Sequence, residues 1–307
     1  MQHLRQMDIY LTGKRYFNGF TFMGNVLGVL HVVSDLDRMV SFFTQVLEFK
    51  EVERLELEGV DFEKLYQLPK GKAKLVKLQL GDEFNYLMEF SSSKQDSFPE
   101  DSRSNDLWFQ HIAIVVSDME KAYAKLIKNG VSAISESCQT IPEWNKSAAG
   151  VKAFYFRSPE GHPLELIYFP PGKGNPNWQK KKGLFLGIDH TAIGVASTEK
   201  SLEFYQDNLG MQVVGGSLNY GDTQEKLSGV TGAKVKITTM QFPDSKSMGI
   251  EFLEYLNPLD GRKKQVGPAD RLFETQTLFQ VDDLEKTLMT LDPDGHRILL
   301  VIDKSLP

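Results

Sequence analysis

The chain has 307 residues, which is long for a single hydrophobic core and suggests two domains. Hydrophobic residues make up 41% and charged residues 25%, as is ordinary for a globular protein with a sizeable core. The net charge of −6 argues against binding to DNA or RNA, because that affinity depends on Lys and Arg neutralising phosphates.

Residues 1–22 are polar and mixed in charge, and we interpret them as an N-terminal extension. They lack the apolar core of a secretion signal, and no run in the chain approaches the roughly 20 apolar residues that span a bilayer. The single cysteine, Cys138, cannot form an internal disulfide, which fits a reducing compartment. The sequence therefore predicts a cytoplasmic protein that binds neither membrane nor nucleic acid.

The two halves of the chain repeat each other. Residues 42–49 (FFTQVLEF) match residues 204–211 (FYQDNLGM) at a shift of 162 (204 − 42). Without a gap, the same shift aligns Gly59 with Gly221 and Glu89 with Glu251. One register held over such a length indicates an internal duplication.

A second repeat lies within each half. The segment His111–Lys121 matches His190–Lys200, and Gln276–Lys286 gives the same pattern again. The Pro/Gly-rich stretch 170–176 (PPGKGNP) is typical of a linker between the halves. The predicted organisation is therefore domain 1 over 23–174, with units 23–95 and 105–170, and domain 2 over 175–307, with units 184–258 and 270–303.

The second unit shows how each copy should fold. Residues 111–116 (HIAIVV) are short and β-branched, which predicts a strand, and Ser117-Asp118 offers an N-cap to a helix over 119–128. Asn129-Gly130 ends that helix, and strands over 153–156 and 163–169 flank the turn SPEG at 158–161. The predicted fold is α+β, with four βαβββ units of which the fourth is shortened.

Several of these stretches resemble the vicinal oxygen chelate superfamily of glyoxalase I, extradiol dioxygenases, methylmalonyl-CoA epimerase and bleomycin-resistance proteins. The stretches are Asp189-His190, residues 202–210 (LEFYQDNLG) and residues 158–166 (SPEGHPLEL), and the resemblance covers nearly all of 23–303. It implies two cupped sheets, each built from two units that hold a metal between their first and last strands.

The resemblance also implies ligand positions. In unit order, the first strands carry Gly28, His111, His190 and Gln276, and the last strands carry Glu89, Glu165, Glu251 and Leu299. With neighbouring units paired, Glu89, His111 and Glu165 would form an N-terminal site, and His190, Glu251 and Gln276 a C-terminal one. Such ligands suit divalent Fe, Mn, Ni, Co or Zn. Core histidines and glutamates paired with Arg or Lys are the alternative interpretation.

The fourth unit is short. From His111 to Glu165 is 54 residues, but from Gln276 to Leu299 is 23, a deficit of 31 (54 − 23). We therefore expect the C-terminal cup to be open or completed by another chain in a homodimer, and we favour the N-terminal cup. His162 and His296 follow turns, and we expect both to be exposed.

The resemblance implies a metal-dependent isomerase, lyase or epimerase that chelates adjacent oxygens of a small substrate. Glu89 or Glu165 would be the general base. Tyr220 and Glu225 are candidate substrate contacts, or equally surface residues.

Two alternatives remain open. An extradiol dioxygenase would need two histidines and a carboxylate in the C-terminal domain, where Gln276 and Leu299 occupy two of the three positions. A protein that binds a small molecule without metal is the other alternative.

Overall fold

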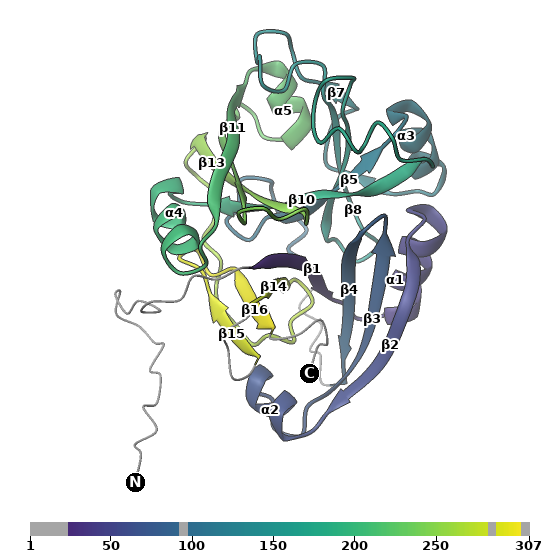
Figure 1. Cartoon of the computed structure of the whole chain (residues 1–307), viewed down its shortest axis with the longest axis vertical. Coiled ribbons are helices and arrows are strands. Elements are labelled where there is room, and N and C mark those ends of the chain that lie inside the picture. The colour runs from purple at the N-terminus through teal and green to yellow at the C-terminus, as the bar shows by residue number, and fades with distance from the viewer. Residues whose placement is uncertain (1–23, 92–97, 282–286, 302–307) are drawn as a thin grey trace.

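The computed structural model describes residues 24–91, 98–281 and 287–301, and it confirms the α+β class with four repeated units (Figure 1). The predicted extension over 1–22 lies outside the described residues, as do residues 282–286 of the fourth unit. Within the described ranges, no helix is both long enough and apolar enough to cross a membrane.

Each unit begins with a strand that is followed, in the first three units, by a helix. The first unit contains β1 (Asn25–Val32), α1 (Leu36–Ser41), the π-helical turn η1 (Phe42–Val46), β2 (Lys50–Glu58), α2 (Val60–Tyr66), β3 (Lys72–Leu80) and β4 (Glu83–Phe90). The second contains β5 (Gln110–Val116), α3 (Met119–Lys128), β6 (Ser132–Ala133), β7 (Gln139–Thr140), β8 (Lys152–Arg157) and β9 (Pro163–Tyr168).

The third unit repeats the first, including its second short helix, and the fourth is reduced to strands among the described residues. The third contains β10 (Phe185–Val195), α4 (Thr198–Asp207), β11 (Gln212–Tyr220), α5 (Asp222–Ser228), β12 (Lys234–Gln241) and β13 (Gly249–Asn257). The fourth contains β14 (Thr275–Gln280), β15 (Leu288–Leu291) and β16 (Arg297–Val301).

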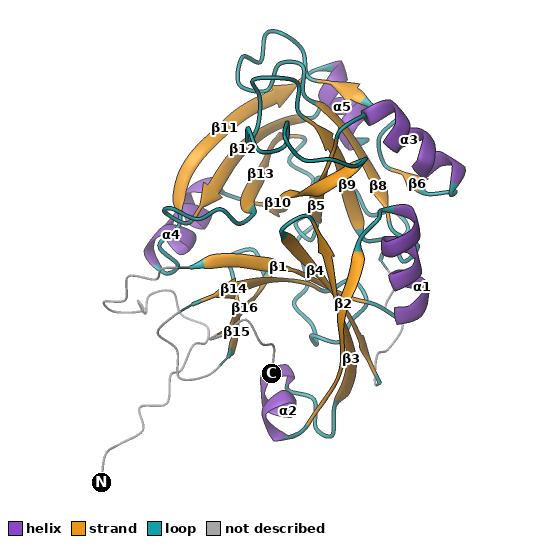
Figure 2. Ribbon diagram, turned by 45° about the vertical axis from the view of Figure 1, so that its right-hand side comes forward, coloured by secondary structure: helices purple, strands orange, loops and turns teal. Residues whose placement is uncertain are grey.

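The strands form two curved sheets, here called sheet A and sheet B. Sheet A has the order β15-β16-β14-β1-β4-β3-β2, and sheet B has the order β11-β12-β13-β10-β5-β9-β8-β6, with β7 beside β8. Sheet B is the upper one in Figure 1, and Figure 2 shows how β11, β12 and β13 curl to form one wall of its cup.

The pairing of units differs from the predicted one. Sheet A joins the first unit to the fourth through β1 and β14, and sheet B joins the second to the third through β5 and β10. The expectation that neighbouring units pair within each half is therefore wrong. Four similar units can pair in more than one way, and connections of similar length separate all of them, so neither property selects the partner.

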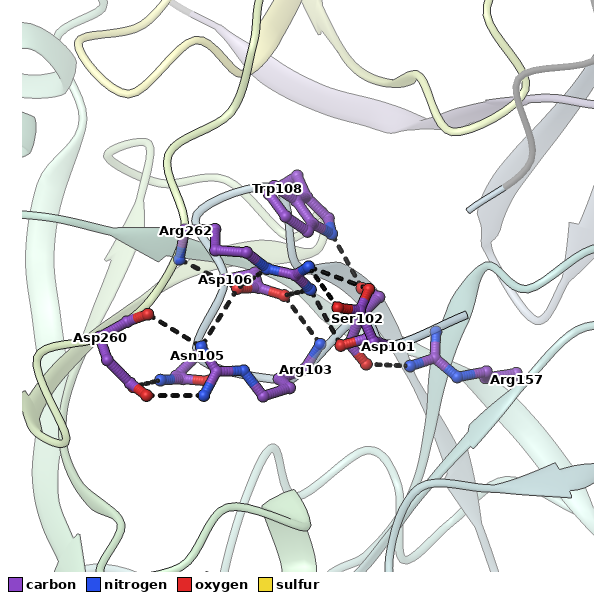
Figure 3. Close-up of polar contacts among 9 residues, drawn as sticks. All are labelled: Asp101, Ser102, Arg103, Asn105, Asp106, Trp108, Arg157, Asp260 and Arg262. Atoms are coloured by element: carbon purple, nitrogen blue, oxygen red, sulfur yellow. Dashed lines mark hydrogen bonds and ion pairs between the residues drawn. The ribbon is translucent and has the colours of Figure 1, made fainter. Parts of the chain in front are cut away.

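Two of the connections cross between the sheets side by side, and a polar network that we call the clasp joins them (Figure 3). Arg262 donates to both carboxylate oxygens of buried Asp106, at 3.0 and 2.7 Å, and its guanidinium lies over the Trp108 ring. In return, Arg103 donates to Asp260 at 2.7 Å. The clasp ties the connection between units one and two to the connection between units three and four.

The predicted turn histidines are buried, not exposed. His162 and His296 are each 1% exposed. His162 Nε2 lies 3.0 Å from the carbonyl oxygen of Val32, and His296 Nε2 lies 2.8 Å from that of Gly194. Each turn reaches across to the opposite sheet, so its imidazole satisfies backbone carbonyls that would otherwise be buried unpaired.

Hydrophobic packing distinguishes the two cups. The largest core lies between the sheets and includes side chains of α1, α3 and α4. A second cluster, which includes Leu30, Met88, Leu278 and Leu299, fills the cup of sheet A. In sheet B the apolar residues form two smaller clusters. His111 of β5 lies between Phe109 of one, which directly precedes the strand, and Ala113 of the other.

Candidate metal centre

Four acidic and imidazole side chains meet at the centre of sheet B. They come from four adjacent strands: His111 from β5, Glu165 from β9, His190 from β10 and Glu251 from β13. In the β5–β10 pair, Ala192 is opposite His111 and His190 is opposite Ala113; Ala113 is in turn level with Glu165. Because alternate side chains of a strand share one face, this register directs all four residues to the same point.

The distances define a compact cluster. His111 Nε2 lies 3.0 Å and His190 Nε2 lies 3.5 Å from the same oxygen of Glu165, Oε2. Glu251 Oε2 lies 3.4 Å from His190 Nε2. Ligand atoms of His111, Glu165 and His190 all fall within 4.8 Å of one another. Three side chains are therefore already gathered around one point, with a fourth beside it.

Burial and the neighbouring charges act in opposite directions on the pKa values of this cluster. Burial alone would raise the pKa of Glu165, but hydrogen bonds from His111 and His190 lower it to about 2. Burial alone would lower the pKa of His190, yet the nearby Glu251, Asp189 and Glu165 carboxylates hold it well above its usual value. In the metal-free chain a proton on His190 thus compensates for the buried carboxylates.

A cavity of about 700 Å³ opens beside His190. Thr239 and Gln241 of β12 line one side of it. Asp82 and Glu83, from the turn and strand that follow β3 in sheet A, also line it, as do residues of the connections between β9 and β10 and between β12 and β13. The wall is therefore rich in polar groups and is built by both sheets.

Comparison with known proteins agrees with this architecture. The model of the Glyoxalase/Bleomycin resistance protein/Dioxygenase superfamily matches residues 26–166 and 187–304. The chain belongs to this superfamily.

The individual proteins that the chain resembles share less than a third of its residues over the matched lengths. The chain is 31% identical over 148 residues to a 2-epi-5-epi-valiolone epimerase of Actinomyces sp, a match that covers 47% of this chain and 79% of the relative. Its fold is similar to glyoxalase I from Zea mays, with a TM-score of 0.60 and 16% identity over 92% of this chain and 93% of the other. A point mutant of the maize protein gives a TM-score of 0.61 over 92% and 94% of the two chains, again at 16% identity.

Members of this superfamily generally use divalent metals, and the donor set in sheet B fits such an ion. Two imidazoles and a carboxylate are ligands that suit first-row divalent metals. His111 is fully buried, its Nδ1 has no hydrogen bond among the described residues, and its Nε2 lies 3.0 Å from Glu165 Oε2. A buried imidazole whose nitrogen faces a carboxylate oxygen suits a shared divalent metal ion.

The equivalent point in sheet A has lost this chemistry. Gly28 pairs with Leu278 in sheet A, as His190 pairs with Ala113 in sheet B. Leu299 lies level with Leu278, as Glu165 lies level with Ala113. Gln276 takes the position of His111, and its side-chain amide oxygen, Oε1, lies 3.5 Å from the Tyr66 hydroxyl. Among the described residues, the side chains that fill the cup of sheet A therefore form no cluster of metal ligands.

Glu89 does not occupy the position that the ungapped repeat predicted. In sheet A, Lys74 is opposite Glu89, whereas its repeat counterpart Lys236 is opposite Glu254. The residue equivalent to Glu251 is Tyr86, at a shift of 165 (251 − 86), because the connection between β3 and β4 is shorter than that between β12 and β13. Glu89 therefore lies on the other face of its strand.

The predicted site residues consequently divide into two groups. His111 and Glu165 of the expected N-terminal site meet His190 and Glu251 of the expected C-terminal site, whereas Glu89 and Gln276 lie in sheet A. Tyr220, at the end of β11, stacks on Trp144, and Glu225 lies in α5; neither is among the described residues that line the cavity. Their role as substrate contacts stays a prediction.

Sequence reasoning missed the cavity wall supplied by sheet A. One signal was available for the cluster itself: only the second and third units carry both a histidine at the first-strand position and a glutamate at the last-strand position. Two complete half-sites are expected to face each other, and they do.

Proposed function

We propose that this chain is a divalent-metal-dependent epimerase or isomerase that acts on a small polyhydroxylated substrate. The observation that carries the proposal is the convergence of His111, Glu165, His190 and Glu251 at a point where His190 lines a cavity with many polar residues. An ion held by His111, Glu165 and His190 would polarise adjacent substrate oxygens and make the neighbouring C–H bond more acidic.

Glu251 is the candidate general base. It is the most exposed of the four side chains, at 20%, and Thr239, which lines the cavity, donates to its Oε1 at 2.9 Å. Its carboxylate can take the proton from the carbon next to the polarised oxygen: the C–H bond breaks, an O–H bond forms on Glu251, and the electron pair moves towards the oxygen. The buried Glu165, with its pKa lowered to about 2, is a poor general base.

Epimerisation also requires that a proton return to the opposite face of the carbon. Glu83 reaches the cavity from sheet A, and burial raises the pKa of its carboxyl to about 7. Near neutral pH it can therefore hold a proton and donate it. A base on sheet B and an acid on sheet A would face the substrate from two walls.

Two further observations support a polyhydroxylated substrate. The cavity presents the amides of Asn175, Asn177 and Gln241 and the hydroxyls of Thr239 and Ser247, which suit hydrogen bonding to several hydroxyl groups. The curated relative is, by its name, an epimerase of 2-epi-5-epi-valiolone. We therefore choose that compound and related polyol ketones as first substrates.

The test has two parts. Elemental analysis of the purified chain after incubation with Fe, Mn, Ni, Co and Zn should find about one ion per chain. The loaded protein in deuterated buffer should then exchange the proton next to the ketone of its substrate for deuterium, as followed by NMR. A chain that takes up no ion, or a loaded chain that exchanges no proton of any polyol ketone tried, would contradict the proposal.

A ring-cleaving dioxygenase is the second candidate, and one observation favours it. The observed His111, His190 and Glu165 are a two-histidine, one-carboxylate set, as in non-haem Fe(II) oxygenases. The argument against this class rested on Gln276 and Leu299, which lie in sheet A. Oxygen uptake by the Fe(II)-loaded chain with catechols would select this activity; the additional carboxylate of Glu251 beside His190 makes us prefer proton transfer.

A further inference from the structure

A tryptophan in the connection between β9 and β10 contacts the metal centre indirectly. Trp178 is 6% exposed, and its indole Nε1 donates to Asp189 Oδ1 at 2.9 Å. The other oxygen of that carboxylate, Oδ2, lies 3.0 Å from His190 Nδ1. A continuous chain of hydrogen bonds thus runs from the connection to a candidate ligand.

The contact between Asp189 and His190 depends on an irregularity of β10. Adjacent residues of a regular strand point to opposite faces of the sheet, so their side chains do not normally meet. Here the pairing of β10 with β5 shifts register between Ile188 and His190. Bulges of this kind re-aim side chains and are common next to active sites.

The hydrogen bond fixes which ring nitrogen of His190 is available as a ligand. With Nδ1 held by Asp189, Nε2 is the nitrogen directed at Glu165 and Glu251. His111 has no such partner, because its Nδ1 makes no hydrogen bond among the described residues and its ring is packed against Phe109 and Tyr155. The two histidines are therefore oriented by different means.

The first unit is connected to Trp178 through Lys181. The ammonium of Lys181 lies 4.6 Å from the centre of the Trp178 ring and 2.8 Å from Asp82 Oδ2. Asp82 belongs to the turn between β3 and β4 of sheet A. Lys181 therefore links the turn of sheet A to the tryptophan that donates to Asp189.

We propose that Asp189 is the positioning residue for His190, and that Trp178 anchors Asp189 in this role. The inference rests on the metal site proposed above. A carboxylate that accepts the Nδ1 proton fixes the tautomer, orients the ring and increases the basicity of Nε2, and loss of such a partner typically weakens metal affinity about 10- to 100-fold.

The first measurement is a Co²⁺ titration of the whole chain, followed by its visible absorption. Asp189→Ala should weaken Co²⁺ binding about 10- to 100-fold, and Trp178→Phe, which keeps the ring but loses the N–H donor, should weaken it by a smaller factor. Asp222→Asn and Trp144→Phe, which alter an exposed aspartate and an exposed tryptophan, are the matched controls and should bind as the wild type does. Wild-type affinity in Asp189→Ala would overturn the inference.

A second measurement does not need the metal. In the metal-free wild type, the hydrogen-bonded Nδ1 proton of His190 should give a downfield proton resonance, which Asp189→Ala should abolish and Asp222→Asn should retain. Persistence of this resonance in Asp189→Ala would contradict the positioning role. If the wild type binds no Co²⁺ but loses the resonance on substitution, the proposed function fails while the positioning of His190 stands.

Discussion

The rings of His111 and His190 meet edge to face with their centroids 5.8 Å apart, although the two residues belong to different repeat units. They approach because β5 and β10 are antiparallel neighbours at the centre of sheet B. The oxygen Oε2 of Glu165 lies within 3.5 Å of an Nε2 of both. The two histidines therefore belong to one site.

This relationship predicts the metal stoichiometry of variants. Because one site needs both histidines, His111→Ala and His190→Ala should each lower the content from about one ion per chain to near zero. The measurement is elemental analysis after dialysis against trace metal.

The controls come from sheet A. Glu89→Gln and Gln276→Ala should keep the wild-type metal content, because neither residue lies in the cluster. Loss of only half of the metal from each histidine variant, starting from two ions per chain, would show that two separate sites exist.

Much of the fold was predictable because local signals repeat. Ser117-Asp118 ahead of α3 and Ala196-Ser197 ahead of α4 mark the same helix start, and in both the last of these side chains accepts from a backbone N–H three residues on. Local chemistry of this kind depends only on neighbouring residues, so the sequence is sufficient to detect it. The second short helices, which follow Gly59 in unit one and Gly221 in unit three, were not among the predicted elements.

The partners of the units were not predictable, because pairing depends on contacts between distant segments. The Arg262–Asp106 pair of the clasp joins residues 156 positions apart, and the contact of His162 with Val32 joins residues 130 positions apart. The ungapped alignment of Glu89 with Glu251 failed for a related reason. The connection before β4 is shorter, so the strand is shifted by three residues (89 − 86). The identical dipeptides Glu89-Phe90 and Glu251-Phe252 conceal this shift in the sequence. An odd shift turns a side chain to the opposite face.

Glu251→Gln tests the proposed base. The amide cannot accept the substrate proton, so we expect kcat to fall about 10²- to 10⁴-fold with little change in KM. Glu254→Gln is the matched control, because Glu254 lies on the same strand but its carboxylate accepts from Thr198, at the first position of α4. An unchanged kcat in Glu251→Gln would remove Glu251 from the reaction, and the metal content of both variants should be checked alongside.

Arg262→Ala tests the clasp. Asp106 is fully buried, and the substitution removes the fork that neutralises it, leaving mainly backbone N–H donors from residues 103 and 262. Breaking a buried ion pair by removing one partner costs about 3 kcal/mol or more, so we expect the free energy of unfolding in urea to fall by about that amount. Arg262→Lys keeps the charge but loses the two-pronged hydrogen bonding, so its free energy of unfolding should lie between those of Arg262→Ala and the wild type. Equal stability of Arg262→Ala and the wild type would show that the clasp contributes nothing to stability.

The ionised cluster should give the metal-free chain a stability that depends on pH in both directions. The pKa of Glu165 is lowered from 4.5 to about 2, so its contribution is present above pH 4.5 and is lost as the pH falls towards 2. That shift corresponds to about 3 kcal/mol. The pKa of His190 is raised above 6.5, so its contribution is present below pH 6.5 and is lost as the pH rises through the raised value. The free energy of unfolding should therefore be greatest between about pH 4.5 and 6.5.

Urea unfolding of the chelator-treated chain from pH 3 to pH 9 measures this dependence. Glu165→Gln should lose the decline at acid pH, because the amide does not titrate, and should also lower the pKa of His190 by removing a carboxylate beside it. Glu254→Gln, outside the cluster, should keep the wild-type profile. An ion bound at the cluster must displace the proton from His190, so metal affinity should rise with pH over the range in which the metal-free chain becomes less stable. A profile that Glu165→Gln leaves unchanged at acid pH would mean that other carboxylates, not this one, set the acid limit of the fold.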